Sequence, residues 1–316
     1  MNSHIAILCL SLLVLIVSAN LLLKFIKKFA GRIKISPLII GATIIAVGTS
    51  LPETFVAITS ISQNVPGISL GDVIGSNIAN ISLILGLGIL LFPVRVGTEK
   101  TQRNNLIMLA ATVVFSALFF VPPTYKKIIG IVLLISYIVF VIIETTWGET
   151  GRKHEDKKAL AKIATSKGNP IFYFLGIAAS LGGLVISSHY LVNSVVYFSK
   201  LLKISEEVIG LSVVAFGTSL PELATTIASG FGRDWKLIYG NIQGSNIYNF
   251  AVIGSILFIA NGTGLTPSFY PLIILWIVTL GIIYLSRRFE GTNIPRIYGV
   301  LFLAIYSFYI FKLYYI

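Results

Sequence analysis

The chain has 316 residues, of which 55% are hydrophobic and only 11% are charged, and its mean hydropathy is +0.90. This composition excludes an ordinary soluble globular domain and indicates a protein of the lipid bilayer. The formal net charge of +12 would suggest a nucleic-acid partner for a soluble protein. In a membrane protein, however, the distribution of Lys and Arg among the loops first indicates the orientation of the chain in the membrane.

Apolar windows of about 20 residues predict ten transmembrane helices along the chain. In chain order they cover residues 4–23, 37–62, 69–92, 104–121, 127–146, 170–198, 207–230, 237–260, 268–286 and 297–315. The sequence therefore predicts an all-α polytopic membrane protein with ten spans. We expect residues 1–147 and 170–316 to form two repeats of five helices each, joined by a cytoplasmic loop at 148–169.

The first apolar segment has two interpretations. Val17, Ser18 and Ala19 loosely resemble a signal-peptide cleavage site. The first basic residue, however, is Lys24, which follows the apolar segment instead of preceding it. We therefore expect a retained helix with its N-terminus outside the cell. The single cysteine, Cys9, excludes an internal disulfide.

With that orientation, 19 of the 24 Lys and Arg residues fall in loops on the inner side. This distribution follows the positive-inside rule, so the net charge requires no nucleic acid. It predicts a multi-pass protein of the plasma membrane with both termini extracellular. Because each repeat has an odd number of spans, the second repeat enters the membrane in the opposite direction. Inverted repeats are an architecture of secondary transporters.

Two polar motifs occur twice within the apolar sequence. GTSLPE stands at residues 48–53 and 217–222, and GSN at 75–77 and 244–246, so both motifs recur with one constant offset. A carboxylate at membrane depth is costly unless it faces a partner, water or an ion. Glu53 and Glu222 have no Lys or Arg nearby in the sequence. Their expected counter-charge is a cation or a proton.

The residues around these carboxylates offer oxygen ligands. Pro52 and Pro221 break the helices there, which is expected to free backbone carbonyls. The candidate ligands are Glu53, Glu222, Asn80, Asn249, Ser76, Ser245, Thr49, Thr218, Ser50 and Ser219, with the carbonyls of Ala46 and Ala215. Oxygen donors suit hard cations such as Ca2+ or Na+ and do not suit a soft thiolate site.

Some of these features also have purely structural interpretations. The GSN motif can serve close helix packing and hydrogen bonding between helices. Asp72 and its counterpart Asn241 fall at predicted helix N-termini, where we expect them to act as caps. His189 is expected to be a packed or interfacial side chain and not a ligand.

At the paired motifs the chain resembles the calcium/cation antiporter superfamily, in particular its prokaryotic Na+/Ca2+ exchanger branch. The resemblance covers nearly the whole length. It implies a core of the second, third, seventh and eighth helices, with Glu53 and Glu222 as central ligands and Asn80 and Asn249 beside them. The motif hydroxyls and the two alanine carbonyls would complete the Ca2+ and Na+ sites.

One position departs from that family, because many relatives have Asp where this chain has Asn249. The substitution leaves two central negative charges, on Glu53 and Glu222, which one Ca2+ or two Na+ would neutralise. It is more similar to the K+-independent branch than to the K+-dependent one.

We therefore expect an antiporter that exchanges Na+ for Ca2+ by alternating access and extrudes Ca2+, with the first and sixth helices sliding against the core. The alternatives are an exchanger of H+ for Ca2+ or another divalent cation and, more remotely, a cation channel. An intramembrane hydrolase needs a base beside Ser50 or Ser219. The single His189 cannot serve both serines, so we expect no enzyme. Beyond the transported ions and the bilayer, we expect no cofactor, nucleic acid or obligate protein partner.

Overall fold

The computed structural model describes residues 2–32, 48–96, 99–151, 170–233, 235–260, 265 and 267–315. These residues form helices joined by turns, with two isolated β-bridges between loops. Within these ranges eight helices are long and apolar enough to cross a membrane. The predicted all-α polytopic membrane fold is therefore confirmed.

The helices of the first half surround the first pair of motifs. They are α1 (Asn2–Arg32), α3 (Leu51–Ser62), α4 (Pro66–Ile78), the π-helix η1 (Ala79–Leu85), α5 (Gly86–Leu91), α6 (Glu99–Ala117) and α7 (Pro123–Gly151). The predicted span at 37–62 begins outside the described residues, and α3 is its second part. Helix α6 is not among the eight apolar spans, and its first turns carry Glu99, Lys100 and Arg103.

The second half has corresponding elements at similar spacing. They are α9 (Pro170–Leu202), α10 (Glu206–Ile209), the π-helix η2 (Gly210–Val214), α11 (Ala215–Thr218), α12 (Leu220–Phe231), α13 (Trp235–Tyr248), the π-helix η3 (Asn249–Ile253), α14 (Gly254–Ala260), α15 (Phe269–Arg288) and α16 (Arg296–Tyr314). Helices α3 and α12 have the same length, and their first residues are separated by the offset of the motifs. The connection at 152–169 lies outside the described residues.

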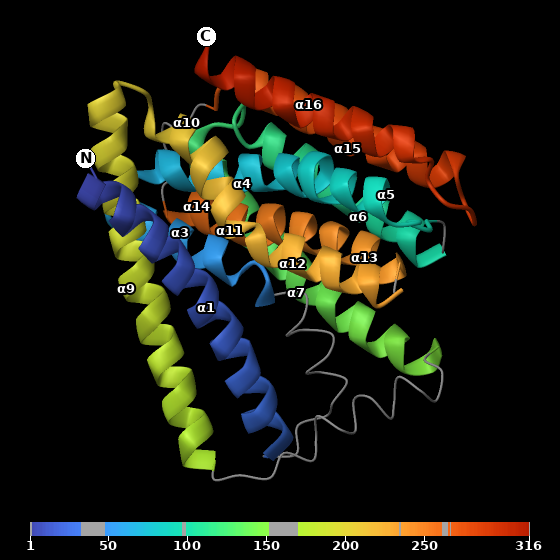
Figure 1. The fold of residues 1–316 in the computed structure, drawn as a ribbon, viewed down its shortest axis with the longest axis horizontal. Helices are drawn as coiled ribbons and strands as arrows, with labels where there is room; N and C mark the ends of the chain where they lie inside the picture. Colours follow the sequence, from blue (N-terminus) through green and yellow to red (C-terminus); the bar gives the residue numbers. More distant parts are fainter. Residues whose placement is uncertain are drawn as a thin grey trace.

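Helices α1 and α9 form a pair that lies beside the other helices (Figure 1). Leu15 and Ala19 of α1 and Leu184 and Leu191 of α9 are buried in one cluster. Only 28% of the apolar window of either helix is buried, so most of their surface is left to lipid. The pair therefore covers the core through one narrow face.

The centre of the molecule is formed by the continuous helices α4–η1–α5 and α13–η3–α14. Their apolar windows are 83% and 78% buried, against 17% for α16. A helix that is apolar on all sides and buried on all sides belongs to the interior. Both helices carry a GSN motif, so the sequence places polar groups where hydrocarbon and protein exclude water.

Glycines let α4 approach α10 and η2 at backbone distance. A Cβ added to Gly71 would collide with the carbonyl oxygen of Glu207, and one at Gly75 would lie 2.5 Å from that of Leu211. From the opposite side, a Cβ at Gly210 would lie 2.7 Å from the Ile68 carbonyl oxygen. Small residues at such positions permit close helix packing in membranes. This contact sets the position of the motif that follows on each helix.

Two loops, one from each half of the chain, lie against each other. The Gly291 N–H donates to the Val96 carbonyl at 2.9 Å, and the Ile294 N–H donates to the Val94 carbonyl at 3.1 Å. The loop after α5 and the loop between α15 and α16 therefore lie at the same end of the helices.

The close approach at Gly71 can be tested by adding one methyl group. We expect Gly71→Ala to lower the melting temperature of the purified protein, because overpacking of this kind costs about 1–3 kcal/mol. The matched control is Gly182→Ala in α9, where an added Cβ meets nothing within 4 Å. Alanine favours helix over glycine, so this control should melt at the same temperature as the wild type or higher. Equal melting temperatures for the two variants would contradict the packing described.

Candidate ion-binding site

The two motif glutamates occupy the same place on equivalent helices. Glu53 is the third residue of α3 and Glu222 the third residue of α12, each directly after a proline at the second position. Glu53 is 1% exposed and Glu222 is fully buried. The free N–H groups of a helix start favour a negative charge at this position. Each helix break therefore makes a place for a buried carboxylate.

Glu222 receives hydroxyl groups from both motif pairs. Its Oε1 accepts from Ser50 Oγ at 3.3 Å and from Ser245 Oγ at 3.0 Å. Thr49 Oγ1 lies 3.3 Å from Ser245 Oγ. Ser50 and Thr49 belong to the first GTSLPE motif, whereas Glu222 belongs to the second. The two halves of the chain therefore share one polar centre.

Several oxygen atoms of this centre are buried without a hydrogen-bond partner among the described residues. They are both carboxylate oxygens of Glu53, Oε2 of Glu222, Oγ of Ser219 and the side-chain oxygens of Asn80 and Asn249. An unpaired buried polar group costs several kcal/mol in an apolar medium, by an estimate of about 2–7 kcal/mol, and a buried group without a partner requires an explanation. A cation bound at this centre would be such an explanation, because each of these oxygen atoms has a lone pair to offer.

The asparagines lie where the central helices change to π-helix. Asn80 is the second residue of η1 and Asn249 is the first of η3. Asn80 Nδ2 donates to Asn246 Oδ1 at 3.0 Å, and Asn246 Nδ2 donates to the Asn77 carbonyl at 3.3 Å. This chain of bonds orients Asn80 so that its oxygen stays free. Short π-helical turns are frequent at functional sites.

The expectation that Asp72 and Asn241 act as helix caps is wrong. Helix α4 begins at Pro66 and α13 at Trp235, so Asp72 and Asn241 lie in helix interiors. Asp72 is fully buried, and its Oδ1 accepts from Ser76 Oγ at 3.1 Å and Thr218 Oγ1 at 3.0 Å. It also interacts electrostatically with Glu53 and Glu222. The centre therefore contains three carboxyl groups instead of the two expected.

The carbonyl of Ala215 lies at the centre, but it is not freed by the helix break at Pro221, as the sequence predicts. Its oxygen accepts the Ser219 N–H at 3.2 Å, so Pro221 does not free it. The hydroxyls of Ser76 and Thr218 both lie 3.5 Å from this carbonyl oxygen. The carbonyl therefore still faces a cluster of oxygens. Its counterpart, Ala46, lies outside the described residues.

Most of the candidate ligands are buried. Those that are buried are Ser50, Glu53, Ser76, Asn80, Ala215, Thr218, Ser219, Glu222, Ser245 and Asn249, and Thr49 is half-buried. In the described part of the chain, no three Cys, His, Asp or Glu side chains gather closely enough to hold a metal ion by themselves. A cation here must therefore also use hydroxyl, amide and carbonyl oxygens, which suits Ca2+ and Na+.

His189 lies apart from the motif serines. Its ring nitrogens lie 2.8 Å from Gln63 Nε2 and 3.0 Å from Asn193 Nδ2, at the contact between α9 and the end of α3. Ser50 is hydrogen-bonded to Glu222, and Ser219 Oγ has no partner among the described residues. Within the described ranges, neither serine is hydrogen-bonded to an imidazole that could act as its base.

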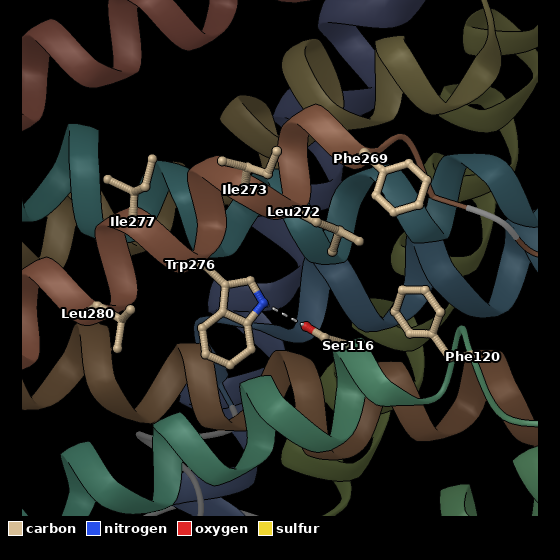
Figure 2. Close-up of a pocket in the computed structure, with 8 residues that line it drawn as sticks. All are labelled: Ser116, Phe120, Phe269, Leu272, Ile273, Trp276, Ile277 and Leu280. Carbon is tan, nitrogen blue, oxygen red and sulfur yellow. Dashed lines mark hydrogen bonds between the residues drawn. The ribbon is translucent and has the colours of Figure 1, made fainter.

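A cavity of about 370 Å³ lies between α6 and α15, away from these carboxylates. Its lining consists of Ser116, Phe120, Phe269, Leu272, Ile273, Trp276, Ile277 and Leu280 (Figure 2). The Trp276 indole N–H donates to Ser116 Oγ at 3.2 Å, so the principal polar groups of the lining satisfy each other. An apolar cavity of this kind offers nothing to a cation.

The fold and the buried oxygen centre define an ion transporter of the membrane, and sequence comparison agrees. The family model of the sodium/calcium exchanger protein matches residues 3–146 and 172–315. The chain therefore belongs to the sodium/calcium exchanger family.

Individual relatives span nearly the whole chain. An uncharacterized membrane protein of Methanocaldococcus jannaschii, MJ0091, is 32% identical over 89% of this chain and 88% of its own length. The sodium/calcium exchanger MaX1 of Methanosarcina acetivorans is 28% identical over 98% of both chains. A solved structure of the sodium-calcium exchanger NCX_Mj superimposes with a TM-score of 0.66 at 28% identity, covering 98% of each chain.

The two central carboxylates should be indispensable for binding Ca2+. We expect Glu53→Gln and Glu222→Gln each to weaken Ca2+ binding at least about 100-fold, or about 2.7 kcal/mol, because each removes one of the charges that oppose a divalent cation. The measurement is the Ca2+-dependent rise in melting temperature of the purified protein. Glu99→Gln, at an exposed glutamate, is the control and should bind like the wild type. Unchanged Ca2+ binding in both motif variants would contradict this site.

Proposed function

We propose that this protein is a secondary antiporter that exchanges Na+ for Ca2+ by alternating access, and that it acts as a transporter and not as an enzyme. The observation that carries the proposal is the pair of buried glutamates, Glu53 and Glu222, with three of their four carboxylate oxygens unpartnered among the described residues. In a member of the sodium/calcium exchanger family, such a pair is best explained as the place where the exchanged cations bind.

The same residues explain why the two fluxes are coupled. Covering uncompensated carboxylates with the apolar surface of moving helices is costly, whereas Ca2+ or Na+ neutralises their charge. A transporter that changes sides only with its centre filled must bring one ion back for the other. Ca2+ takes about six to eight oxygen ligands, more than two glutamates supply, so neighbouring hydroxyls and amides are needed as well.

The proposed ligand set follows the two motif pairs. It consists of Glu53, Glu222, Asn80, Asn249, Ser76, Ser245, Thr49, Thr218, Ser50 and Ser219, with the carbonyls of Ala46 and Ala215. Support comes from the hydrogen bonds that link members of opposite halves, such as Ser50 to Glu222, and from the free oxygen atoms of Asn80 and Asn249.

Helices α1 and α9 are the proposed moving elements. A Cβ at Gly217 would lie 2.6 Å from the Leu12 side chain, and a Cβ at Gly48 would collide with that of Leu23. Helix α1 therefore covers the first glycine of both GTSLPE motifs with leucines. Helices α1 and α9 pack mainly against each other and expose most of their surface to lipid, so the proposed motion is a sliding of the pair in which α1 crosses these glycines.

The division into two inverted repeats, at residues 1–147 and 170–316 with a cytoplasmic connection at 148–169, is also a proposal. The constant offset of the motifs supports this division. Asn64 and Arg233, both left-handed turn residues with φ of 59°, are separated by the same offset.

For location we propose the plasma membrane with both termini outside. The contact between the loops after α5 and α15 is consistent with this orientation, which places both loops inside.

H+/Ca2+ exchange is the nearest alternative, because protons could neutralise the same glutamates. A transport measurement distinguishes Na+ coupling from H+ coupling.

In proteoliposomes loaded with Na+ and diluted into Na+-free buffer, we expect rapid uptake of radioactive Ca2+. K+-loaded vesicles and Glu53→Gln vesicles should take up at most about one tenth as much. Uptake driven by a pH jump without Na+ would contradict Na+ coupling and favour H+ exchange.

The proposed orientation can be tested by labelling single cysteines. Starting from Cys9→Ser, we expect Lys200→Cys to react with a membrane-impermeant maleimide in intact cells, because we place this end of α9 outside. Thr292→Cys, between α15 and α16, should react only after permeabilisation. Both positions are exposed, so access depends on the membrane side. The reverse pattern would invert the proposed topology.

A further inference from the structure

Polar side chains join helix α9 to the last turn of α3. Thr59 Oγ1 lies 2.7 Å from Ser188 Oγ. Ser188 Oγ donates its own hydrogen to the Val185 carbonyl at 3.0 Å, so it accepts the hydrogen of Thr59. One turn beyond Thr59, Gln63 Nε2 lies 2.8 Å from His189 Nδ1. These bonds fix the position of α9 along α3.

The imidazole of His189 has an amide neighbour on each side. Its Nε2 lies 3.0 Å from Nδ2 of Asn193, which stands one turn further along α9. A neutral imidazole has one donor and one acceptor nitrogen, and an amide can either donate or accept. Gln63 and Asn193 can therefore satisfy both ring nitrogens at once. We call this group the latch; it consists of Thr59, Gln63, Ser188, His189 and Asn193.

The offset that relates the two motif pairs also relates α1 to α9. Leu15 and Leu22 of α1 are buried in the same cluster as Leu184 and Leu191 of α9, which stand at the corresponding positions. The apolar windows of the two helices are also buried to the same extent. Each residue of the latch therefore has a counterpart in the other half of the chain.

These counterparts do not have the chemistry of the latch. Thr59 and Gln63 correspond to Ala228 and Gly232 at the end of α12. The residues of α9 that take part, Ser188, His189 and Asn193, correspond to Ala19, Asn20 and Lys24 of α1. Alanine and glycine have no side-chain group that forms a hydrogen bond. Helix α1 therefore cannot form the same latch on α12.

We propose that the latch biases the transporter toward the conformation seen in the structure and slows its departure from it. In the proposed architecture of inverted repeats, a change of side exchanges the roles of the two halves. In the opposite state α1 would lie against α12 as α9 now lies against α3, and Ala228 and Gly232 would leave it without these bonds. One state is therefore latched and the other is not. The inference rests on the proposed alternating access.

Removing the latch should make the opposite state more populated. We expect Thr59→Val combined with Gln63→Leu to raise the ratio of the opposite state to the present one about five-fold, because each hydrogen bond between membrane helices contributes little. The measurement is the distribution of distances between spin labels at Lys200→Cys in α9 and Thr124→Cys in α7, in a Cys9→Ser background at saturating Ca2+. Both labelled positions are exposed.

Asn20→Ala is the matched control for this measurement. Asn20 stands in α1 where His189 stands in α9, but its Nδ2 donates to the Ile16 carbonyl of its own helix at 3.1 Å. The control should have the distance distribution of the wild type. A latch variant with the wild-type distribution, or a control with a shift as large as that of the latch variant, would overturn the proposal.

A cross-link keeps the proposal testable if the latch variant does not fold. Thr59→Cys combined with Ser188→Cys, again with Cys9→Ser, places thiols where two hydroxyl oxygens lie 2.7 Å apart, close enough for a disulfide. We expect oxidation to reduce Na+-dependent Ca2+ uptake into proteoliposomes at least about ten-fold, because a locked conformation cannot shift. Dithiothreitol should restore the uptake. Undiminished uptake with the disulfide formed would overturn the proposal, since the latch would then stay closed throughout transport.

The uptake assay also separates this inference from the proposed function. If wild-type vesicles show no Na+-dependent Ca2+ uptake, the proposed function itself fails. If the wild type transports Ca2+ and the oxidised cysteine pair transports it equally well, only the latch is wrong.

Discussion

The constraint on which the rest of the structure depends is the burial of two carboxylates inside a membrane protein. Glu53 and Glu222 lie in the interior of a membrane protein at broken helix starts. Glu222 accepts hydrogen bonds from two hydroxyl groups, whereas both carboxylate oxygens of Glu53 have no hydrogen-bond partner in the described part of the chain. Serine, threonine and asparagine around them satisfy only part of the charge. In the function proposed above, a cation satisfies the remaining oxygens.

The helices around the centre serve to hold two short motifs against each other. Glycines at the contact of α4 with α10 and η2 allow backbone contact, which brings Ser76 and Thr218 to the same carboxylate. The π-helices shift the register where Asn80 and Asn249 stand. Helix α1 lies across the motif glycines, and its partner α9 packs against α3. A rigid core with a loosely attached cover is what alternating access requires.

The sequence predicted the spans and the central glutamates because both signals are local. A run of apolar residues long enough for a bilayer is visible directly, and so is an acid inside it. The sequence predicts Asp72 as a helix cap because hydropathy starts that helix at residue 69, whereas α4 starts at Pro66. Its partner Thr218 is 146 residues away, so no local pattern contains that bond. The sequence predicts that Pro221 leaves the Ala215 carbonyl without a hydrogen bond. Only the backbone geometry shows that this carbonyl accepts the Ser219 N–H.

The most direct test of the central claim is equilibrium binding of Ca2+ to the purified protein over a series of Na+ concentrations. If both ions neutralise the same pair of glutamates, one Ca2+ binds per chain and Na+ displaces it competitively. The displacement should be steeper than for a single competing ion, because more than one Na+ is needed to balance the charge. Ca2+ binding that does not respond to Na+ would contradict a shared site.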